Sequence, residues 1–209
     1  MTINHQPKAT MNAANGLLDA AGVPQRRGYV MGQFSRFVRP GDLRVDVTTN
    51  TGPLSISAFK DPASGRFAVV TVNNTTFAET QTISLSGIAV SSVTPWITSA
   101  SQSLQQQSAV NVSNGSFTFE IPAQSVVTFA GTQAPVITST SELSTTFGVP
   151  FEFAIAATHS PTSYAAQGLP PGLNIDPTTG VVSGTPLATG EYHGTVTATN
   201  GGNATLVSP

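Results

Sequence analysis

The chain has 209 residues, which suffices for one large domain or two small ones. Only 9% of them are charged, and the formal net charge is −2. We interpret the eight lysine and arginine residues as scattered. They therefore predict no basic surface, and nucleic acid and anionic membranes are poor candidates as partners. With 19 glycines, 15 prolines and short runs of Val, Ile, Thr and Phe, the composition is typical of an all-β protein with many turns.

The chain contains no cysteine, which excludes disulfides, thiolate nucleophiles and thiolate metal sites. No apolar run approaches the length of a membrane span. Residues 1–27 lack the basic-then-apolar order of a secretory signal, so we expect no export signal in the sequence as written. We interpret these residues as a mostly irregular N-terminal segment.

Residues 28–41 predict a short helix with one apolar stripe. The stripe, at positions i, i+4, i+7 and i+8, consists of Val30, Phe34, Phe37 and Val38. The side chains expected to point away are those of Gln33, Ser35 and Arg36. Pro40 cannot supply the amide that a further turn needs, so the helix should stop there. A strand with alternating apolar residues is expected next, at residues 43–49.

Further strand signals follow at the spacing of a β-sandwich. After the strand at 43–49, strands are expected at residues 54–59, 66–73, 79–85, 93–98, 116–121 and 125–130. Asn114-Gly115 is the strongest hairpin signal, because it separates Val110 and Val112 from Phe117 and Phe119. Segment 99–108, which contains three consecutive glutamines, is expected to be a polar surface loop.

Residues 131–135 (GTQAP) are interpreted as a short linker to a second β-module. Its strands are expected near residues 136–139, 150–157, 163–166, 173–175, 181–183, 191–199 and 204–207. Seven short strands within this length favour a small Greek-key sandwich. The predicted fold class is therefore all-β, with a helix-led sandwich at residues 28–131 and a second sandwich at 132–209.

Three motifs lie in the first module: YVMGQFSRFVRPG at 29–41, WITS at 96–99 and IPAQSVVTF at 121–129. In this order they resemble the C-terminal part of family 30 glycoside hydrolases, and most closely the bacterial xylanase and glucuronoxylanase branch. The resemblance spans residues 15–131. It implies that the predicted helix is the last helix of a catalytic (β/α)8 barrel and that the sandwich is the side domain packed against that barrel.

The second module contains YAAQGLPPGLNID at 164–176, SGTP at 183–186, GEY at 190–192 and TVTATN at 195–200. These motifs resemble an Ig-like domain that is common as a repeat in secreted bacterial proteins. The resemblance implies a spacer, adhesion or carbohydrate-proximal role. It also implies a secreted, extracellular location.

The resemblance to the hydrolases implies no catalytic residue in this chain. A retaining glycosidase needs two carboxyl groups about 5–5.5 Å apart. In the family both are glutamates on barrel strands, and the sequence as given contains no barrel. We therefore expect the chain as it stands not to be an enzyme.

Ten carboxylates and three histidines remain as candidates for acid–base or metal chemistry. Those expected on the polar faces of strands are Asp46, Glu79, Glu120, Glu152 and Glu191. Asp61 and Asp176 are expected in turns beside prolines. The spacing of His5, His159 and His193 does not suit zinc, and a calcium site at Asp176 with Glu152 or Glu191 is the less favoured alternative. No metal and no cofactor are predicted.

Aromatic residues are the candidates for carbohydrate binding, because a sugar ring stacks on an aromatic face. Trp96 is the single tryptophan, with partial burial in the sandwich as the alternative interpretation. Tyr192 is interpreted as the core or corner tyrosine of the Ig-like module. The stripe of Phe34, Phe37 and Val38 is expected to fold back on the sandwich, meet another chain or remain exposed.

These observations favour a non-catalytic accessory fragment of a secreted xylan-degrading hydrolase. Its expected partners are plant cell-wall polysaccharide (xylan, with cellulose as a second candidate) and a catalytic barrel, or a second copy through the helix face. The alternatives are a stand-alone carbohydrate-binding module, a structural or adhesive spacer, and an enzyme with an unrecognised site.

Overall fold

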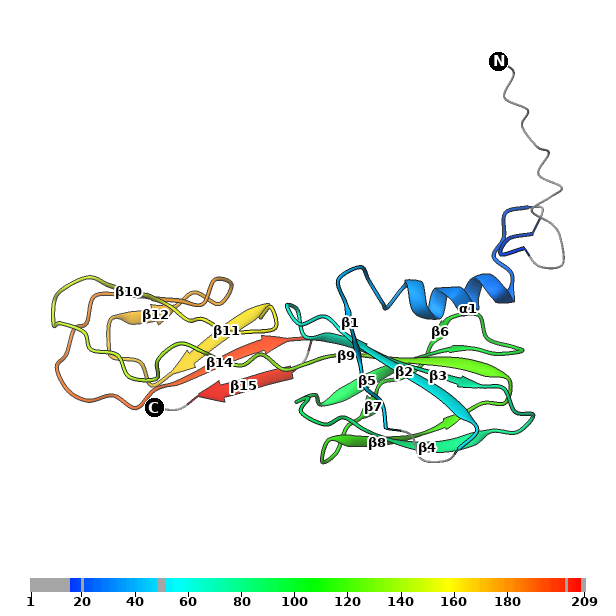
Figure 1. Cartoon of the computed structure of the whole chain (residues 1–209). Coiled ribbons are helices and arrows are strands. Elements are labelled where there is room, and N and C mark those ends of the chain that lie inside the picture. Colours follow the sequence, from blue (N-terminus) through cyan, green and yellow to red (C-terminus); the bar gives the residue numbers. More distant parts are fainter. Residues whose placement is uncertain (1–15, 20, 49–51, 202, 208–209) are drawn as a thin grey trace, which may run out of the picture. The chain divides into compact units, whose positions relative to one another are not determined.

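The computed structural model describes residues 16–19, 21–48, 52–201 and 203–207. Within them the chain forms one helix and fifteen strands, divided between two compact units (Figure 1). The first unit comprises the described residues up to Lys60 with Phe67–Ser86 and Ser92–Gly131, and the second comprises Asp61–Arg66, Gly87–Ser91 and the residues from Thr132 onward. The all-β prediction is confirmed. The interpretation of residues 1–27 as irregular lies largely outside the described residues.

Helix α1 (Arg26–Ser35) ends earlier than its sequence predicts. The prediction that the helix runs to Pro40 is wrong, because the chain tightens into a turn in which the Phe37 amide donates to the Phe34 carbonyl at 3.0 Å. The Arg39 guanidinium then donates to the Ser35 carbonyl at 2.9 Å, which satisfies one of the last helical carbonyls. Gly41, at φ 97°, takes the left-handed conformation that turns the chain toward the first strand.

A seven-stranded sheet forms the centre of the first unit (Figure 1). Its order is β1-β2-β3-β9-β5-β6, and β7 also pairs with β5. The strands are β1 (Leu43–Val45), β2 (Leu54–Lys60), β3 (Arg66–Asn73), β5 (Ser92–Thr98), β6 (Gln105–Gln106), β7 (Val110–Asn111) and β9 (Ser125–Thr132). Strand β6 lies inside the segment that we expected to be a loop. Its two glutamines pair antiparallel with Trp96 and Ile97, an edge pairing that hydrophobic periodicity does not reveal.

The central sheet is covered on both faces. On one face, Phe129 of β9 contacts Phe117 and Phe119 at ring-centre distances of 4.9 and 5.2 Å. These two phenylalanines belong to β8 (Ser116–Ile121), which pairs with β4 (Glu79–Ser84) as a second sheet. The other face carries α1. Strand β3 therefore buries consecutive residues rather than alternate ones.

The turn at Asn114-Gly115 is present, but the hairpin around it is not the one predicted. Both residues have positive φ, at 50° and 71°, as a two-residue hairpin turn requires. The hairpin consists of a single bridge between Ser113 and Ser116. Beyond it β7 pairs with β5 and β8 pairs with β4, so the flanking segments separate into different sheets.

The second unit contains two three-stranded sheets, β10-β13-β12 and β11-β14-β15 (Figure 1). Their strands are β10 (Phe151–Ala154), β11 (Ser163–Gln167), β12 (Leu173–Ile175), β13 (Val181–Gly184), β14 (Thr195–Asn200) and β15 (Asn203–Val207). The core is formed by Ile155, Leu173 and Val182, with partly buried apolar residues from both sheets packed around it.

Three details of the second unit differ from the prediction. Residues 136–139 form no strand and contribute one bridge, between Ile137 and Ala157. Strand β14 begins at Thr195, so Glu191 lies outside it. The tyrosine packed on the core is Tyr164 rather than Tyr192, which is 36% exposed.

Candidate functional site

Helix α1 is anchored to the sheet by a buried glutamine. The side chain of Gln33 is fully buried, at 0% exposure, and the expectation that it points away from the sheet is wrong. Its Nε2 donates to Thr98 Oγ1 at 2.9 Å and to the Val126 carbonyl at 3.2 Å. The backbone carbonyl of Gln33 accepts a hydrogen bond from Thr128 Oγ1 at 3.0 Å. One helical residue thus bonds to both β5 and β9.

The loop after β5 completes this anchor. Thr98 Oγ1 also accepts the amide of Leu104 at 3.1 Å, so one hydroxyl ties the helix and the loop to the same strand. A Cβ added at Gly32 would lie 3.2 Å from the Leu104 side chain, which shows how closely the helix backbone approaches the loop. Arg26 donates to the Ala100 carbonyl at 3.0 Å. The helix is therefore held along its length.

The predicted aromatic stripe folds back on the sheet. Phe34 meets Phe59 edge to face at 6.4 Å, although Phe34 remains 37% exposed. Phe37 packs against Trp96 at 5.4 Å. Val38 is half-buried and donates its amide to the Phe34 carbonyl at 2.8 Å. The structure thus brings all four sequence-predicted site residues, Trp96 included, to one face of the unit.

Arg36 covers the indole of Trp96. Its Cζ lies 4.0 Å from the centre of the indole, within the range of a cation–π contact, and 5.7 Å from that of Phe37. Trp96 is half-buried. One face of the only tryptophan is therefore occupied by a guanidinium group, and a sugar ring could stack on that face only if Arg36 moved.

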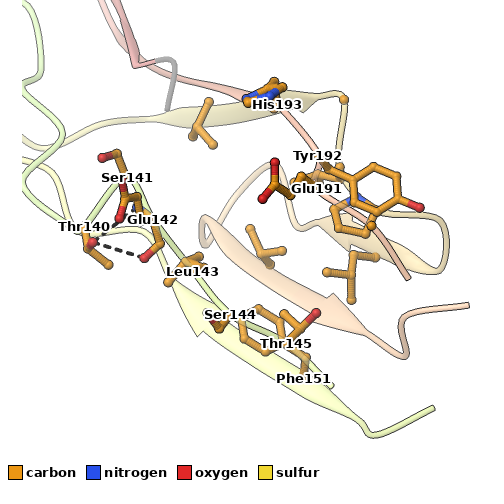
Figure 2. A pocket seen from close by; sticks show the side chains of 18 of the residues that line it. Thr140, Ser141, Glu142, Leu143, Ser144, Thr145, Phe151, Glu191, Tyr192 and His193 are labelled. Atoms are coloured by element: carbon orange, nitrogen blue, oxygen red, sulfur yellow. Dashed lines mark hydrogen bonds between the residues drawn. The ribbon is translucent and has the colours of Figure 1, made fainter. Parts of the chain in front are cut away.

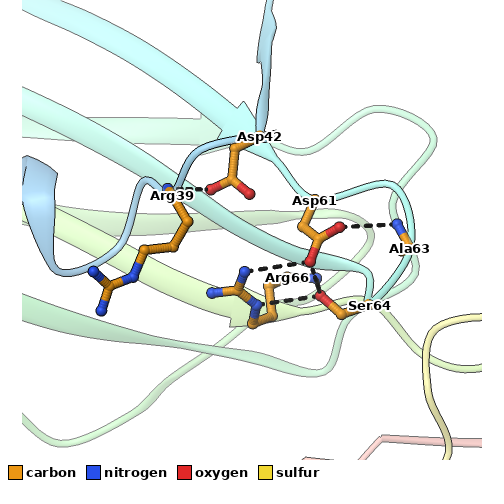
Figure 3. A network of polar contacts seen from close by, with 6 residues as sticks. All are labelled: Arg39, Asp42, Asp61, Ala63, Ser64 and Arg66. Carbon is orange, nitrogen blue, oxygen red and sulfur yellow. Dashed lines mark hydrogen bonds and ion pairs between the residues drawn. The ribbon is translucent and has the colours of Figure 1, made fainter.

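Two aspartates shape the turns Asp61-Pro-Ala-Ser-Gly65 and Asp176-Pro-Thr-Thr-Gly180. Figure 3 shows the first, in which Asp61 accepts hydrogen bonds from Ser64 Oγ at 2.5 Å, the Ala63 amide at 3.0 Å and Arg66 at 3.2 Å. The Ser64 hydroxyl, followed by the Ala63 amide, lowers the pKa of the Asp61 carboxyl from 3.8 to about 2. Amides of Thr179 and Thr178 lower the pKa of Asp176 in the same way. Both carboxylates use their oxygens as hydrogen-bond acceptors within their own turns.

The other carboxylates and the histidines form no metal site in the described part of the chain, where no group of three or more potential ligands comes together. Glu120 and Glu152 lie at exposed strand positions as predicted, whereas Asp46 and Glu191 lie outside strands. His159 Nδ1 is 2.8 Å from the Ala134 carbonyl, a backbone contact rather than a catalytic pairing.

The basic residues are not scattered, contrary to the first interpretation. All eight lie between Lys8 and Arg66, and the sequence contains no lysine or arginine after Arg66. Five arginines fall on α1, the segment after it and β1: Arg26, Arg27, Arg36, Arg39 and Arg44. In the described residues, α1 is too short to cross a membrane.

Comparisons with known proteins found two kinds of similarity. Residues 134–208 match the family described as "Putative Ig domain" (He_PIG). Glucuronoxylanase XynC from Bacillus subtilis is 37% identical over 115 residues, which cover 54% of this chain and 27% of the relative. The first module is similar to the C-terminal side domain of family 30 xylanases. The chain thus spans about a quarter of the length of the relatives it matches.

Two solved structures support the same similarity. A family 30 endoxylanase from Clostridium papyrosolvens C71 superposes with a TM-score of 0.54 and 35% identity, covering 58% of this chain and 31% of that one. The family 30 subfamily 8 xylanase Xyn30A from Clostridium acetobutylicum gives a TM-score of 0.53 and 31% identity, covering 57% and 31%. The resemblance inferred from the three motifs is confirmed.

The residues missed by sequence reasoning are the polar partners that hold α1. Gln33, Thr98 and Thr128 are fully or almost fully buried, yet each is a polar residue that a hydrophobic pattern assigns to a surface. One available signal was the run Val126-Val127-Thr128-Phe129, because a strand with no polar alternation is typically covered on both faces.

Proposed function

We propose that this chain is a non-catalytic accessory part of a secreted xylan-degrading glycoside hydrolase, which supports or tethers a catalytic barrel. The observation that carries the proposal is the buried Gln33 anchor, through which a helix resembling the last helix of a barrel is built into the sandwich. A barrel packed against that helix would be fixed to the sandwich without a flexible link.

The surface available to a barrel is the outward side of α1. Phe34 and Phe37 already contact the sheet, whereas Arg27, Met31 and Ser35 form an exposed row at positions i, i+4 and i+8. Met31 is 56% exposed in the centre of this row. An apolar side chain flanked by polar ones at helical spacing suits a helix that packs beside other helices.

The positions of the carboxylates favour a non-catalytic, accessory role of the chain over catalysis. Asp61 and Asp176 use their oxygens to close turns. Glu120 and Glu152 lie on exposed strand positions of different units. A retaining mechanism requires one carboxyl with a raised pKa close to a second, ionised one. The two shifted carboxyl pKa values described here are both lowered.

The test is whether the chain binds a catalytic barrel that is supplied as a separate protein. The full chain is mixed with the Bacillus subtilis glucuronoxylanase from which the C-terminal side domain has been deleted, and binding is measured by calorimetry. We expect saturable binding that Met31→Glu abolishes and Ser163→Glu, an exposed change on β11, leaves intact. Failure of the wild-type chain to bind, or equal binding of Met31→Glu, would count against the proposal.

A carbohydrate-binding module is a second candidate, which rests on the half-buried Trp96 and requires Arg36 to leave the indole face. It predicts retention on insoluble xylan or cellulose that Trp96→Ala abolishes. A structural spacer predicts no retention and self-association through α1. Sizing chromatography of the wild-type chain and of Phe34→Ser tests the spacer. If both are monomers, self-association through α1 does not occur and the spacer is disfavoured.

A further inference from the structure

The Ig-like unit contains a cavity of about 610 Å³, a size typical of small-molecule sites. Its floor is formed by Phe151, Ile155, Leu173, Val182 and Val196, which belong to or pack against the core of the unit. The cavity therefore reaches apolar side chains that a closed sandwich would cover with its own residues. It belongs to the second unit and is separate from the α1 site.

Two segments outside the strands border the cavity. Figure 2 shows residues 140–145 on one side of the opening and residues 191–193 on the other. Leu143 and Tyr192 are 45% and 36% exposed, so each rim contributes a partly exposed apolar side chain. Because neither segment belongs to a strand, the rims can move apart without breaking a sheet.

The polar groups of the cavity define its chemistry. Ser139 Oγ is buried and has no hydrogen-bond partner among the described residues. A buried hydroxyl without a partner is costly, so a ligand group that reaches it when the 140–145 rim moves outward, and hydrogen-bonds to it there, is favoured. Glu142 and Glu191 are the carboxylates of the lining. No lysine or arginine follows Arg66 in the sequence, so His193 is the one described lining side chain that can carry a positive charge, against the two carboxylates.

We propose that this cavity binds an uncharged, mainly apolar small molecule that carries one hydrogen-bonding group, and that it rejects anions. The apolar floor takes the body of the ligand, and Ser139 Oγ takes its polar group. The carboxylates of Glu142 and Glu191 disfavour a negative charge at the opening. The proposal does not rest on the accessory role proposed above for the chain.

A matched pair of fluorescent probes tests the proposal. N-phenylnaphthylamine is neutral and has one N–H group, and anilinonaphthalene sulfonate adds a sulfonate to the same rings. With the full chain at low salt, the neutral probe should bind saturably with a blue-shifted emission. Its affinity should exceed that of the sulfonate by at least about tenfold, a difference that salt reduces.

Two sets of variants locate the binding. Ala188→Trp places an indole in the cavity and should weaken the neutral probe by about tenfold or more, whereas Ser183→Trp, on an exposed position of β13, should not. The pair Glu142→Gln and Glu191→Gln should raise sulfonate affinity toward that of the neutral probe. Unfolding temperatures identify any variant that fails to fold.

Three results would overturn the proposal. The first is the absence of saturable binding of the neutral probe to the wild-type chain. The second is binding that Ala188→Trp leaves unchanged while the unfolding temperature shows an intact fold. The third is equal affinity for both probes, before and after the two glutamate substitutions, which would indicate unspecific contact with exposed core residues.

Discussion

The Gln33 carboxamide donates a hydrogen bond to Thr98 Oγ1 at 2.9 Å in a site from which solvent is excluded. This bond links the middle of α1 to β5. When one member of a buried hydrogen-bonded pair is removed, the other is left without a partner and destabilises the fold. The bond therefore makes the helix dependent on the sheet and is directly testable.

Replacing Gln33 should destabilise the first unit. Gln33→Ala removes both side-chain hydrogen bonds and leaves a void, but it also removes the buried Gln33 Oε1, which has no partner among the described residues. We therefore expect a net loss of about 1–3 kcal/mol in the free energy of unfolding. Chemical denaturation of the full chain measures it. Gln81→Ala is the control and should cost about 0.5 kcal/mol or less, because the Gln81 side chain donates to the carbonyl of its neighbour Thr82 in an exposed hydrogen bond.

A double-mutant cycle with Thr98→Val isolates the Gln33–Thr98 contact. The two changes should be non-additive by about 1 kcal/mol, because each removes one partner of the same bond. Strict additivity would contradict the role given to this bond.

Removal of the Arg36 guanidinium should alter the fluorescence of the chain. Trp96 is the only tryptophan, so the emission reports this site alone. Arg36→Ala uncovers one face of the indole, and we expect a red-shifted emission, faster iodide quenching and a stability loss of about 0.5–1 kcal/mol. Arg44→Ala removes an exposed arginine of β1 and should leave the emission unchanged. Identical spectra for wild type and Arg36→Ala would show that the stack does not persist in solution.

The Asp61 turn should make stability depend on pH in the acid range. The folded pKa is lowered from 3.8 to about 2, so the stabilisation is complete above the unfolded pKa and disappears as the pH falls through the folded one. Titration of the carboxyl carbon by NMR should give a midpoint near 2, and Ser64→Ala should raise it. A midpoint at the ordinary aspartate value would contradict the hydrogen bonds of this turn.

Two glycines of the second unit form a matched pair for testing its packing. Gly148 and Gly180 have φ of 73° and 72°, so alanine is strained equally at both. Only at Gly180 would the added Cβ meet a neighbour, the ring of Tyr164 at 2.9 Å. We expect Gly148→Ala to cost about 1 kcal/mol and Gly180→Ala about 1–3 kcal/mol more, as measured by thermal unfolding. Equal losses would show that Tyr164 does not pack there.

Much of the fold could be predicted because hydrophobic periodicity and turn chemistry are local signals. Strand β3 coincides with its prediction, and the turns at Asp61 and Asp176 form at the proline-containing motifs. Strand β6 and the Gln33 anchor could not be predicted this way. Both consist of polar residues whose partners are distant in the chain, so their burial depends on the tertiary fold rather than on the local pattern.

The sequence pattern named aromatic residues that lie together in the structure, but it did not predict how they are arranged. The aromatic pattern identified Phe34, Phe37 and Trp96. Sequence spacing could not show that Arg36 covers the indole, since that contact joins residues 60 positions apart in the printed sequence. The interpretation of Tyr192 as the core tyrosine is wrong, because β14 begins only at Thr195 and Tyr164 packs on the core instead.

The most direct test of the central claim is the release of reducing ends from glucuronoxylan by the purified chain. The account predicts no release above the enzyme-free blank, because Asp61 and Asp176 close turns and the exposed strand residues Glu120 and Glu152 belong to different units. Turnover that is lost when one named carboxylate is replaced by its amide, in a variant that still folds, would contradict it.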